Sequence, residues 1–508
     1  MLCRYVARVS QIGGCGPLDD ALAVCESSAG YAPRNPAESV LYNVVAGDLE
    51  NFLAGQRRRD RVVPGFVERE LRKFLECGVL ANGFLRVHCD ACGQDRVVAF
   101  SCKGRGICSS CGGRRMAETA AHLVDRVLPE VPIRQWVLSF PVALRYRLAY
   151  DSRLVSDVLG IFIRALFASL RRRARAYAGI RKAQCGVVTF VQRFGGAVNL
   201  NVHFHSLVLD GVYYLDDRQR LRFRRLPAPG DAEVARVTAR IARRIARLLE
   251  RRGLGREADP DEADPLRRDQ PLLAELYAAS AQGRVALGPR AGSLLTGFGD
   301  QTEEENAALR SAPRCASFSG FSLHANVCIP ARARRQLEKL CRYVARPAVA
   351  TERLSALPDG RLLYHLKHRW RDGTTHVVFE RLEFVAKLAA LVPPPRFNQV
   401  RYHGILAPAA GWRSSIVPLA AAALDAVDPV AHDGCSAGKQ SSHDEKSLPG
   451  RCHPRNYTWA ELMKRVWDQS TNCMPHRSGD FTGPDHPPLS SPLWTGDRVR
   501  RATDRMGR

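Results

Sequence analysis

The spacing of four cysteines constrains the fold of this chain more tightly than any other feature of its sequence. Cys89 and Cys92 form a C-x2-C pair, and fifteen residues later Cys108 and Cys111 form a second one. Each C-x2-C pair forms a tight turn whose two thiolates point at one ion, and two such turns complete a tetrahedral shell. Because four thiolates leave no open position, the spacing predicts a structural zinc ribbon at these four residues.

The remaining cysteines bear on which thiols bind the metal. The chain has sixteen in all, and its first residues, which include Arg4 and Arg8, lack the uninterrupted apolar core of a secretory signal. The cysteines are therefore expected to be reduced, and clustered reduced thiols bind metal more often than they pair with each other. Cys77 and Cys102, together with His88, lie near the predicted set, and either cysteine could replace one of its members.

The charge of the chain indicates the kind of partner it binds. Lys and Arg number 76 against 51 Asp and Glu, so the net charge is +25 at pH 7. A surplus of this size favours a polyanion, either nucleic acid or an anionic membrane surface. The sequence has no apolar run long enough to cross a membrane, which favours nucleic acid and a cytoplasmic location. A generally basic protein without a specific partner is the alternative.

Apolar periodicity predicts a mixture of helices and strands. Helices are expected from residue 36 onward, near residues 66–78, and over residues 152–178, 231–252 and 332–347, with Asp231 as an N-cap and Pro347 as a stop. Residues 253–272 are expected to form a loop. Strands are expected over residues 135–148, where Pro141 introduces a turn, and over residues 185–194 and 199–215. Two further stretches, RLLYHLKHRW and THVVFERLEF, are also strand-like.

The stretch NVHFHSLVLD carries two histidines that suit a metal site. Side chains alternate between the faces of a strand, so His203 and His205 project to one face, while Leu200, Val202 and Phe204 project to the other. Two imidazoles on one face provide two neighbouring ligands and leave open positions for a substrate oxygen. An incidental pair of histidines on a strand is the alternative.

The heptapeptide LCRYVAR occurs twice, at residues 2–8 and 340–346. A phenol has a pKa of about 10 and attacks a phosphodiester only when a divalent ion polarises the phosphate. Tyr343 lies on a predicted helix with Lys339 and Arg346 on the same face, a cationic setting that favours the phenolate and binds phosphate. No such helix precedes Tyr5, so only the second copy is predicted to be reactive. The alternative for Tyr343 is a buried core tyrosine.

Several segments together resemble the HUH-type rolling-circle transposases of the IS-ninety-one-like insertion sequences. They follow in the family's order from about residue 31 to about residue 420: FSCKGRGICSSCGGRRMAETAAHLVD, RQWVLSFP, NLNVHFHSLVLDGVY, SLHANV, LCRYVARPAVATERL and DGTTHVVFERLEFVAKLAALVPPPR. The resemblance implies an α+β fold in which an antiparallel HUH endonuclease sheet, flanked by helices, follows a helical and zinc-binding module. It divides the chain into an irregular segment (1–35), a zinc- and DNA-binding domain (36–120), a catalytic domain (130–418) and a linker with a low-order tail (419–508).

The resemblance also implies a chemistry and a set of site residues. The family's enzymes nick single-stranded transposon ends and transfer strands through a 5′-phosphotyrosine intermediate, with Mg²⁺ or Mn²⁺ at the active site. On the matching positions, Tyr343 becomes the nucleophile, and His203 and His205 become metal ligands. Gln192, ahead of His324, is the expected third ligand, and Lys339 and Arg346 are expected to bind DNA. The expected partners are transposon ends and target DNA near the nucleoid of a prokaryotic cell.

The chain also departs from the family's pattern. Some members carry a second tyrosine four residues after the first, whereas position 347 is proline here, which indicates the single-tyrosine branch. After the helix-like YTWAELMKRVW, Cys473 has no partner pair of the kind the family carries. Two alternative functions stay open: a catalytically inert, zinc-dependent DNA-binding relic, and a plasmid-type relaxase or replication initiator.

Overall fold

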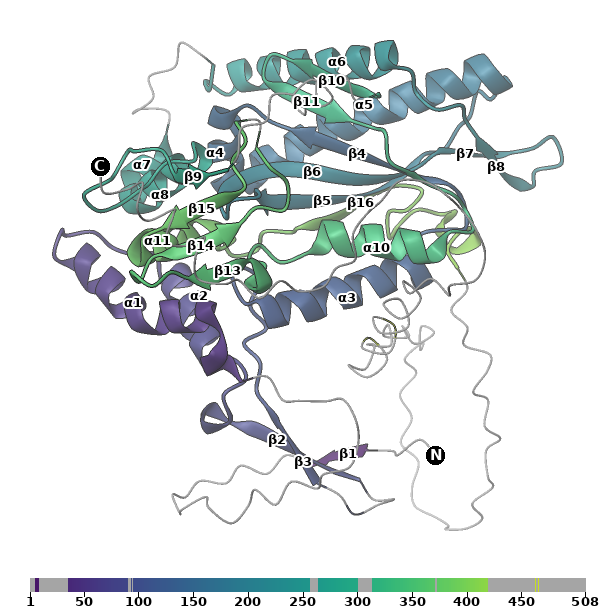
Figure 1. Cartoon of the computed structure of the whole chain (residues 1–508). Helices are drawn as coiled ribbons and strands as arrows, with labels where there is room; N and C mark the ends of the chain where they lie inside the picture. The colour runs from purple at the N-terminus through teal and green to yellow at the C-terminus, as the bar shows by residue number, and fades with distance from the viewer. Residues whose placement is uncertain are drawn as a thin grey trace, which may run out of the picture. The chain divides into compact units, whose positions relative to one another are not determined.

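The computed structural model describes residues 5–8, 35–89, 93, 95–255, 264–299, 313–370, 372–418, 462 and 465 (Figure 1). For residues 5–8, 87, 89 and 96 only the backbone is described. The chain separates into two compact units, Met1–Leu462 and Met463–Arg508, and every described residue except Arg465 belongs to the first. The predicted irregular segment and the predicted tail therefore lie almost entirely outside the described residues.

The first described part of the chain is helical and ends in a small sheet. It comprises η1 (Pro36–Glu38), α1 (Val40–Arg57), α2 (Gly65–Glu76), η2 (Leu80–Asn82), β2 (Phe84–Cys89) and β3 (Asp95–Ala99), with β1 (Tyr5–Arg8) pairing antiparallel with β2. The apolar stripe predicted after residue 36 forms the buried face of α1, as Val44, Leu49 and Phe52 show. This face packs on α2 and on α11 (Arg381–Leu391).

A seven-stranded antiparallel sheet forms the centre of the molecule. Its strands lie in the order β10 (Cys315–Phe318), β11 (Phe321–His324), β4 (Ile133–Ser139), β6 (Leu200–Leu209), β5 (Gly186–Phe194) and β16 (Val400–Gly404), and β12 (Cys328–Ile329) also pairs with β4. The predicted strands at 185–194 and 199–215 are thus confirmed, although the second divides near Asp210 into β6 and β7 (Gly211–Leu215). β6 lies between two strands, so both of its backbone edges are hydrogen-bonded.

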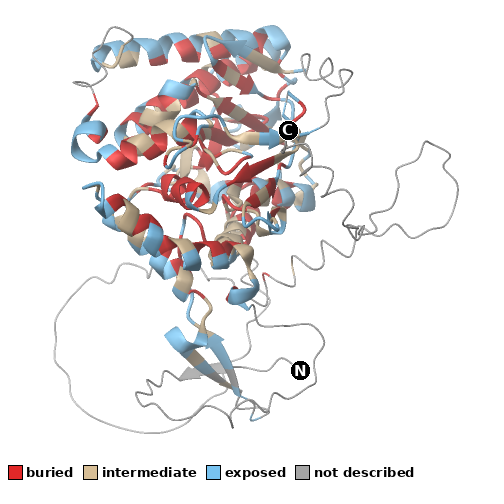
Figure 2. Ribbon diagram, turned by 60° about the vertical axis from the view of Figure 1, so that its left-hand side comes forward, coloured by how far each residue is buried: buried red, intermediate tan, exposed pale blue. Residues whose placement is uncertain are grey.

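Helices cover both faces of this sheet (Figure 1), and many residues of the layers are buried (Figure 2). The buried residues between the layers form two large apolar clusters. One face packs on α4 (Val142–Tyr150), α5 (Ser152–Ala178), α6 (Asp231–Arg251) and α8 (Pro271–Ala281). Leu200, Val202 and Phe204 project into this side, as predicted, and Phe204 contacts Phe140 edge-on at 4.9 Å between ring centroids. The other face packs on α3 (Ser109–Arg126) and α10 (Arg334–Ala345).

The remaining elements complete the described fold. A four-stranded antiparallel sheet takes the order β13 (Leu354–Ala356), β14 (Leu362–His365), β15 (His376–Phe379) and β9 (Thr296–Phe298). β7 and β8 (Leu221–Arg225) form a separate hairpin, and α7 (Pro265–Asp269), η4 (Thr351–Arg353) and η5 (Arg413–Ser415) are short. The result is the predicted mixture of helices with antiparallel sheet. Within the described part of the chain, no helix is both long and apolar enough to cross a membrane.

Four local predictions need correction. The segment after Pro141 forms α4, and most of the stretch after Phe379 forms α11, where strands had been expected, because each buries an apolar helical face. The loop expected over residues 253–272 contains α7. Asp231 lies within the first turn of α6, whose N-cap is Gly230, and the Asp231 side chain accepts a hydrogen bond from the backbone N–H of Arg314.

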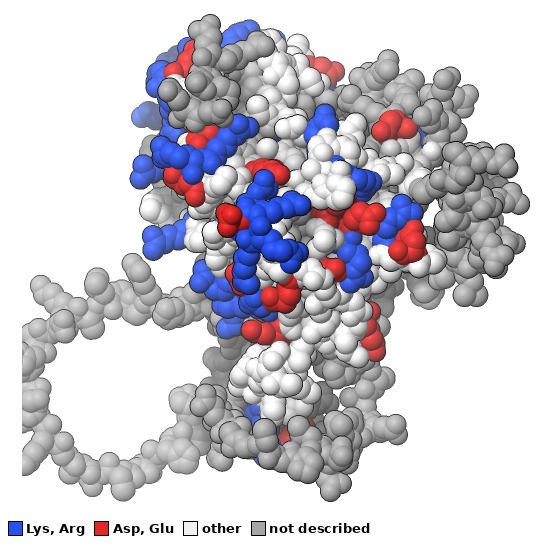
Figure 3. All heavy atoms as spheres, turned by 90° about the vertical axis from the view of Figure 1, so that its left-hand side faces the viewer, with Lys and Arg blue, Asp and Glu red and all other residues white. Residues whose placement is uncertain are grey.

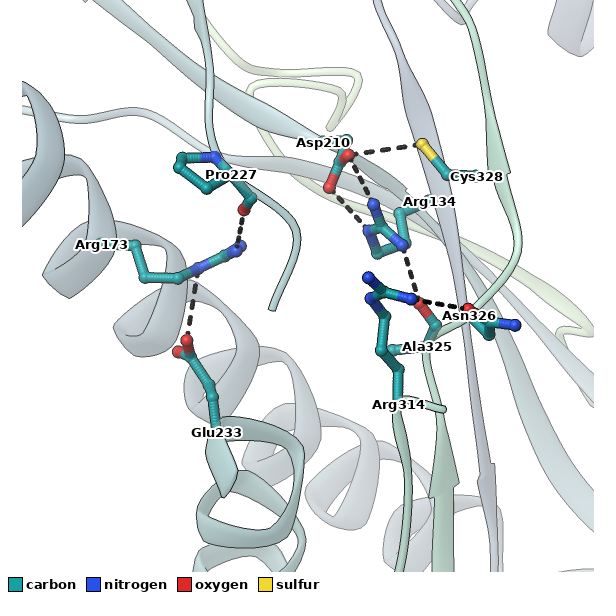
Figure 4. A network of polar contacts seen from close by, with 9 residues as sticks. All are labelled: Arg134, Arg173, Asp210, Pro227, Glu233, Arg314, Ala325, Asn326 and Cys328. Atoms are coloured by element: carbon teal, nitrogen blue, oxygen red, sulfur yellow. Dashed lines mark hydrogen bonds and ion pairs between the residues drawn. The ribbon is translucent and has the colours of Figure 1, made fainter. Parts of the chain in front are cut away.

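A buried ion pair fixes the start of β4 against the end of β6 (Figure 4). Arg134 donates from Nε to Oδ1 of Asp210 at 2.8 Å and from a terminal nitrogen to Oδ2 at 2.9 Å. A third donor of the same guanidinium reaches the backbone carbonyl of Ala325 at 2.9 Å. This two-pronged contact satisfies both charges in a region that water does not reach.

Candidate functional site

Four cysteine thiols meet beside the start of α3. Cys77 follows α2, Cys102 follows β3, and Cys108 and Cys111 lie at the N-terminus of α3. Their four sulfur atoms all lie within 4.8 Å of one another. The distance is 3.7 Å between the sulfurs of Cys77 and Cys108, 3.6 Å between those of Cys77 and Cys111, and 3.5 Å between those of Cys102 and Cys111.

This geometry fits a zinc ion. Zinc–sulfur bonds of about 2.3 Å in a tetrahedron place neighbouring sulfurs about 3.8 Å apart. Two of the four thiols are shifted toward the charged form that zinc needs: contact with Cys102 and then Cys108 lowers the pKa of Cys77 to about 7. Contacts with the same two thiols lower the pKa of Cys111 below its usual range. Contacts within the cluster raise the pKa of Cys102 and Cys108, so the fit to a closed structural site comes from the donors and their spacing.

The cluster shares two members with the set predicted from spacing. Cys108 and Cys111 belong to both, whereas Cys77 and Cys102, the alternatives named from the sequence, complete the four. For Cys89, at the end of β2, only the backbone is described, and Cys92 lies outside the described residues. Two backbone hydrogen bonds bring the alternatives together: Gly78 N–H donates to the carbonyl of Phe100 at 2.9 Å, and Phe100 N–H donates to the carbonyl of Gly83 at 3.0 Å.

The two histidines of β6 point at a common position, as their alternation predicted. The Nε2 atoms of His203 and His205 lie 3.0 Å apart, and Nδ1 of His203 bonds the backbone carbonyl of Asn201 at 2.7 Å. Burial lowers the pKa of His203 to about 4 and that of His205 well below its usual value. Both rings are therefore neutral at pH 7, which leaves lone pairs for a metal. Two nitrogens each about 2.1 Å from one ion, at a right angle, lie about 3.0 Å apart.

Gln135 is a site residue that the sequence did not reveal. Its Nε2 lies 2.9 Å from Nδ1 of His205, and its side chain is buried. On β4 it lies two residues before Val137, which pairs directly with His205, so both side chains share one face of the sheet. The pairing of β4 with β6 would have identified it, but that pairing is not visible in the sequence.

The two candidates for a third ligand differ in their distance from the histidines. Gln192 on β5 is the direct cross-strand partner of His203, and its Nε2 donates to the carbonyl of Val344 on α10 at 3.3 Å. His324 on β11 pairs with a residue of β4 that in turn pairs with His205, so two strand spacings, about 10 Å, separate the backbones of the two histidines. Nε2 of His324 instead lies 3.5 Å from the sulfur of Cys315. Gln192 is thus the nearer candidate.

Tyr343 lies beside the histidine pair and is accessible. Its ring stands edge-on to that of His205, with 5.9 Å between the centroids and 87° between the planes. It is 37% exposed, which excludes the core role considered for it. α10 presents it here because Leu337, Cys341 and Val344 pack the other side of this helix against α3 and the sheet.

Cationic side chains surround Tyr343, and not all of them were predicted. The Arg346 guanidinium lies 5.7 Å from the centroid of the Tyr343 ring, as its spacing on the helix suggested, and Lys339 is exposed one turn earlier. Lys367 lies closer, with its Nζ 4.3 Å from the same centroid. Lys367 follows β14, far from Tyr343 in sequence, so helical spacing could not have identified it. The face of the molecule shown in Figure 3 carries patches of Lys and Arg side chains, with Asp and Glu among them and uncharged areas between.

Comparison with known proteins places these sites in a family. Residues 49–140, which contain the cysteine cluster, match a family model described as "Transposase zinc-binding domain" of the IS91 type. Residues 186–413, which contain the histidine pair and Tyr343, match a family model described as "Putative transposase". No curated protein and no solved structure gives a significant match. The zinc-binding match precedes the transposase match along the chain, and the four-cysteine cluster lies within it. The chain is therefore an IS91-like DNA transposase with an N-terminal zinc-binding domain.

Proposed function

We propose that this transposase nicks single-stranded transposon ends through Tyr343 and rejoins strands by rolling-circle-type DNA transposition. The main support is that two elements converge: α10 presents an accessible phenol edge-on to His205, and β6 points two imidazole nitrogens at one position 3.0 Å apart. A helix-borne tyrosine facing a histidine pair on a central strand is the arrangement that the resemblance to HUH enzymes implied.

The histidine pair would hold the divalent ion. His203, His205 and the amide oxygen of Gln192 are the proposed ligands for Mg²⁺ or Mn²⁺. When bound, such an ion polarises a non-bridging phosphate oxygen and stabilises the leaving oxygen. Gln135 would fix the orientation of the His205 ring by bonding its other nitrogen, the role that outer partners of metal-bound histidines commonly have.

The proposed reaction exchanges one phosphodiester bond for another. The Tyr343 oxygen loses its proton and attacks the phosphorus, and the bond from phosphorus to the 3′ oxygen breaks. The 3′ oxygen takes up a proton, while the 5′ side stays linked to Tyr343. The reverse attack by a 3′ hydroxyl releases the tyrosine, so rejoining needs neither ATP nor water. Arg346, Lys367 and Lys339 would stabilise the charge on the phosphate.

The four-cysteine cluster would have a structural role. We assign Cys77, Cys102, Cys108 and Cys111 as the zinc ligands, because four thiolates leave no open position for a substrate. They connect the end of α2, the end of β3 and the start of α3, and α3 in turn packs against α10. The zinc-binding domain would thereby support the helix that carries Tyr343.

An adduct assay tests the proposal. The full chain is incubated with labelled single-stranded oligonucleotides that cover the two ends of its own element, with Mg²⁺ or Mn²⁺. A covalent protein–DNA adduct on a denaturing gel is expected, and peptide mass spectrometry should locate the DNA on Tyr343. Tyr343→Phe should abolish the adduct, while Tyr5→Phe, in the identical heptapeptide, is the matched control and should leave it unchanged.

The same assay separates the alternatives. His203→Ala combined with His205→Ala should abolish cleavage while DNA binding is retained. A relic without activity would bind DNA and give no adduct under any condition. An adduct that survives in Tyr343→Phe would refute the choice of nucleophile. A relaxase or replication initiator would share the adduct but would cut a plasmid origin in preference to transposon ends.

A further inference from the structure

We infer that the turn between β14 and β15 holds a single DNA strand beside Tyr343, with Lys367 on a phosphate and Trp370 stacked on an unpaired base. This inference rests on the proposed function and adds to it a binding surface for the substrate. The turn is the only described segment outside α10 and the central sheet whose cation lies over the Tyr343 ring. Neither the sequence motifs nor the descriptions of the family models assign this turn a role.

Alternation along β14 directs Lys367 to the tyrosine. The inner face of the small sheet buries Leu362, Tyr364 and Leu366. The residues that alternate with them, His365 and Lys367, are exposed on the other face. The backbone N–H of Leu366 donates to the carbonyl of Thr375 at 2.9 Å, which continues the pairing of the two strands past their ends. The Lys367 ammonium is thus carried by a paired backbone and not by a loose loop.

Among the residues that the structure describes, no carboxylate forms an ion pair with Lys367 or Arg346, the two cations over the Tyr343 ring. Lys367 and Arg346 both lie over the Tyr343 ring. Burial lowers the pKa of Lys367, and the positive charges of Arg346 and Arg353 lower it further. The Nε of Arg346 is buried and has no hydrogen-bond partner among the described residues. The neighbouring Arg353 lies 3.9 Å from the exposed carboxylate of Glu352. A phosphate would relieve this repulsion and supply the missing acceptor.

Trp370 is held at the end of the same turn and remains accessible. Its backbone N–H donates to the carbonyl of Thr374 at 2.9 Å, and its backbone carbonyl accepts from the N–H of Gly373 at 3.0 Å. Gly373, which makes the second of these bonds, has a φ of 86°, a conformation that a residue with a side chain rarely adopts. The indole is nevertheless 38% exposed. A large aromatic ring on a braced turn is a stacking surface of the kind that single-strand-binding proteins use.

The spacing of the two side chains suits a single strand. Lys367 and Trp370 are three positions apart in the sequence, which limits the distance between their Cα atoms to about 10 Å. That span corresponds to about three nucleotides at the 3.4 Å repeat of one stacked strand. Bases of a duplex are already paired and stacked, so Trp370 could stack only on an unpaired or terminal base. The surface therefore selects single-stranded DNA.

Binding measurements test this inference without the covalent step. The probe is a labelled single-stranded oligonucleotide that covers a transposon end, with a duplex of the same length for comparison, and no Mg²⁺ or Mn²⁺ is added. Trp370→Ala should weaken single-strand binding about tenfold or more, since stacking on one base contributes a factor of roughly 5 to 150. Trp370→Phe should restore most of the loss, and duplex binding should not change.

Lys367→Met is expected to act through charge. It keeps the length of the side chain but removes one phosphate contact, so the slope of log affinity against log salt should fall by about 0.7 for a single strand. Lys182→Met, at an exposed lysine after α5, is the matched control and should leave the slope unchanged. Zinc content and thermal unfolding of each variant show whether it is folded.

The outcomes separate the inference from the proposed function. If Trp370→Ala binds single strands like the parent, or weakens single-strand and duplex binding equally, the stacking role is refuted. If Lys367→Met leaves the salt slope unchanged, the phosphate contact is refuted. Loss of binding in these variants together with no covalent adduct in the parent would support this surface and refute the nicking reaction.

Discussion

The identity of the zinc ligands gives the sharpest prediction, because spacing and geometry disagree on two of the four. If Cys77 and Cys102 are ligands, replacing either with serine removes one of four thiolates. Structural zinc sites bind with about 10–16 kcal/mol, and an even division assigns about 2.5–4 kcal/mol to each thiolate. Zinc affinity should therefore fall by a factor of roughly 70 to 900. Cys89→Ser and Cys92→Ser should leave it unchanged.

A zinc-buffered measurement resolves this difference. With free zinc held at ten times the dissociation constant of the parent, the parent should be about 90% loaded, and a variant with hundredfold weaker binding should be about 10% loaded. Zinc per chain is measured by mass spectrometry of the metal after removal of unbound ion. Cys315→Ser, at a cysteine outside the cluster, controls for the substitution itself. Loss of zinc in Cys89→Ser and Cys92→Ser, with full loading of Cys77→Ser and Cys102→Ser, would refute the geometric assignment.

Three further predictions address the proposed divalent-metal site and the stability of the fold. Gln135→Leu removes the amide bonded to the second histidine and should weaken Mn²⁺ binding about 10- to 100-fold, measured by electron paramagnetic resonance; unchanged binding would argue against a positioning role. Asp210→Asn leaves the buried guanidinium of Arg134 without a counter-charge and should cost about 3–5 kcal/mol in urea unfolding, whereas Glu50→Gln, at an exposed pair, should cost less than about 0.5 kcal/mol. Burial lowers the pKa of Lys387 from 10.5 to about 8, so below pH 8 its charge costs up to about 3 kcal/mol, a cost that disappears as pH rises to 10.5. Lys387→Met should therefore be more stable than the parent at pH 7, and a difference that does not shrink between pH 8 and pH 10.5 would contradict this reasoning.

The sequence predicted those parts of the fold whose pattern lies within one element. The strand of His203 and His205 was recognised because apolar residues alternate along it, and α5 because its stripe continues over many turns. The segment after Pro141 was not recognised as a helix. This helix has only nine residues, and its apolar face is buried by packing on β6 and α8. So short an apolar run does not distinguish the helical repeat from that of a strand.

The site was predictable to a similar degree. Neighbours on one strand or one helix, such as the two histidines or Tyr343 with Arg346, follow from the repeat of the element. Gln135 and Lys367 reach the site through strand pairing and through a turn between distant strands, and neither contact has a local pattern. The cysteine cluster shows the same limit, since hydrogen bonds between residues 78, 83 and 100 bring Cys77 beside Cys102.

The repeated heptapeptide shows that seven identical residues do not determine the structure around a tyrosine or its proposed reactivity. In the first copy the residues Tyr5–Arg8 form β1, which pairs with β2, whereas in the second copy the same letters end the helix α10. Identical residues cannot cause this difference, so it must come from what surrounds each copy. Leu337 extends the apolar stripe of the second copy by a turn, and this stripe packs against α3 and the sheet, which stabilises a helix more than propensity does. The same packing aims Tyr343 at His205 and beneath Lys367, and that position, which the letters LCRYVAR alone do not specify, is what would make the phenol a nucleophile.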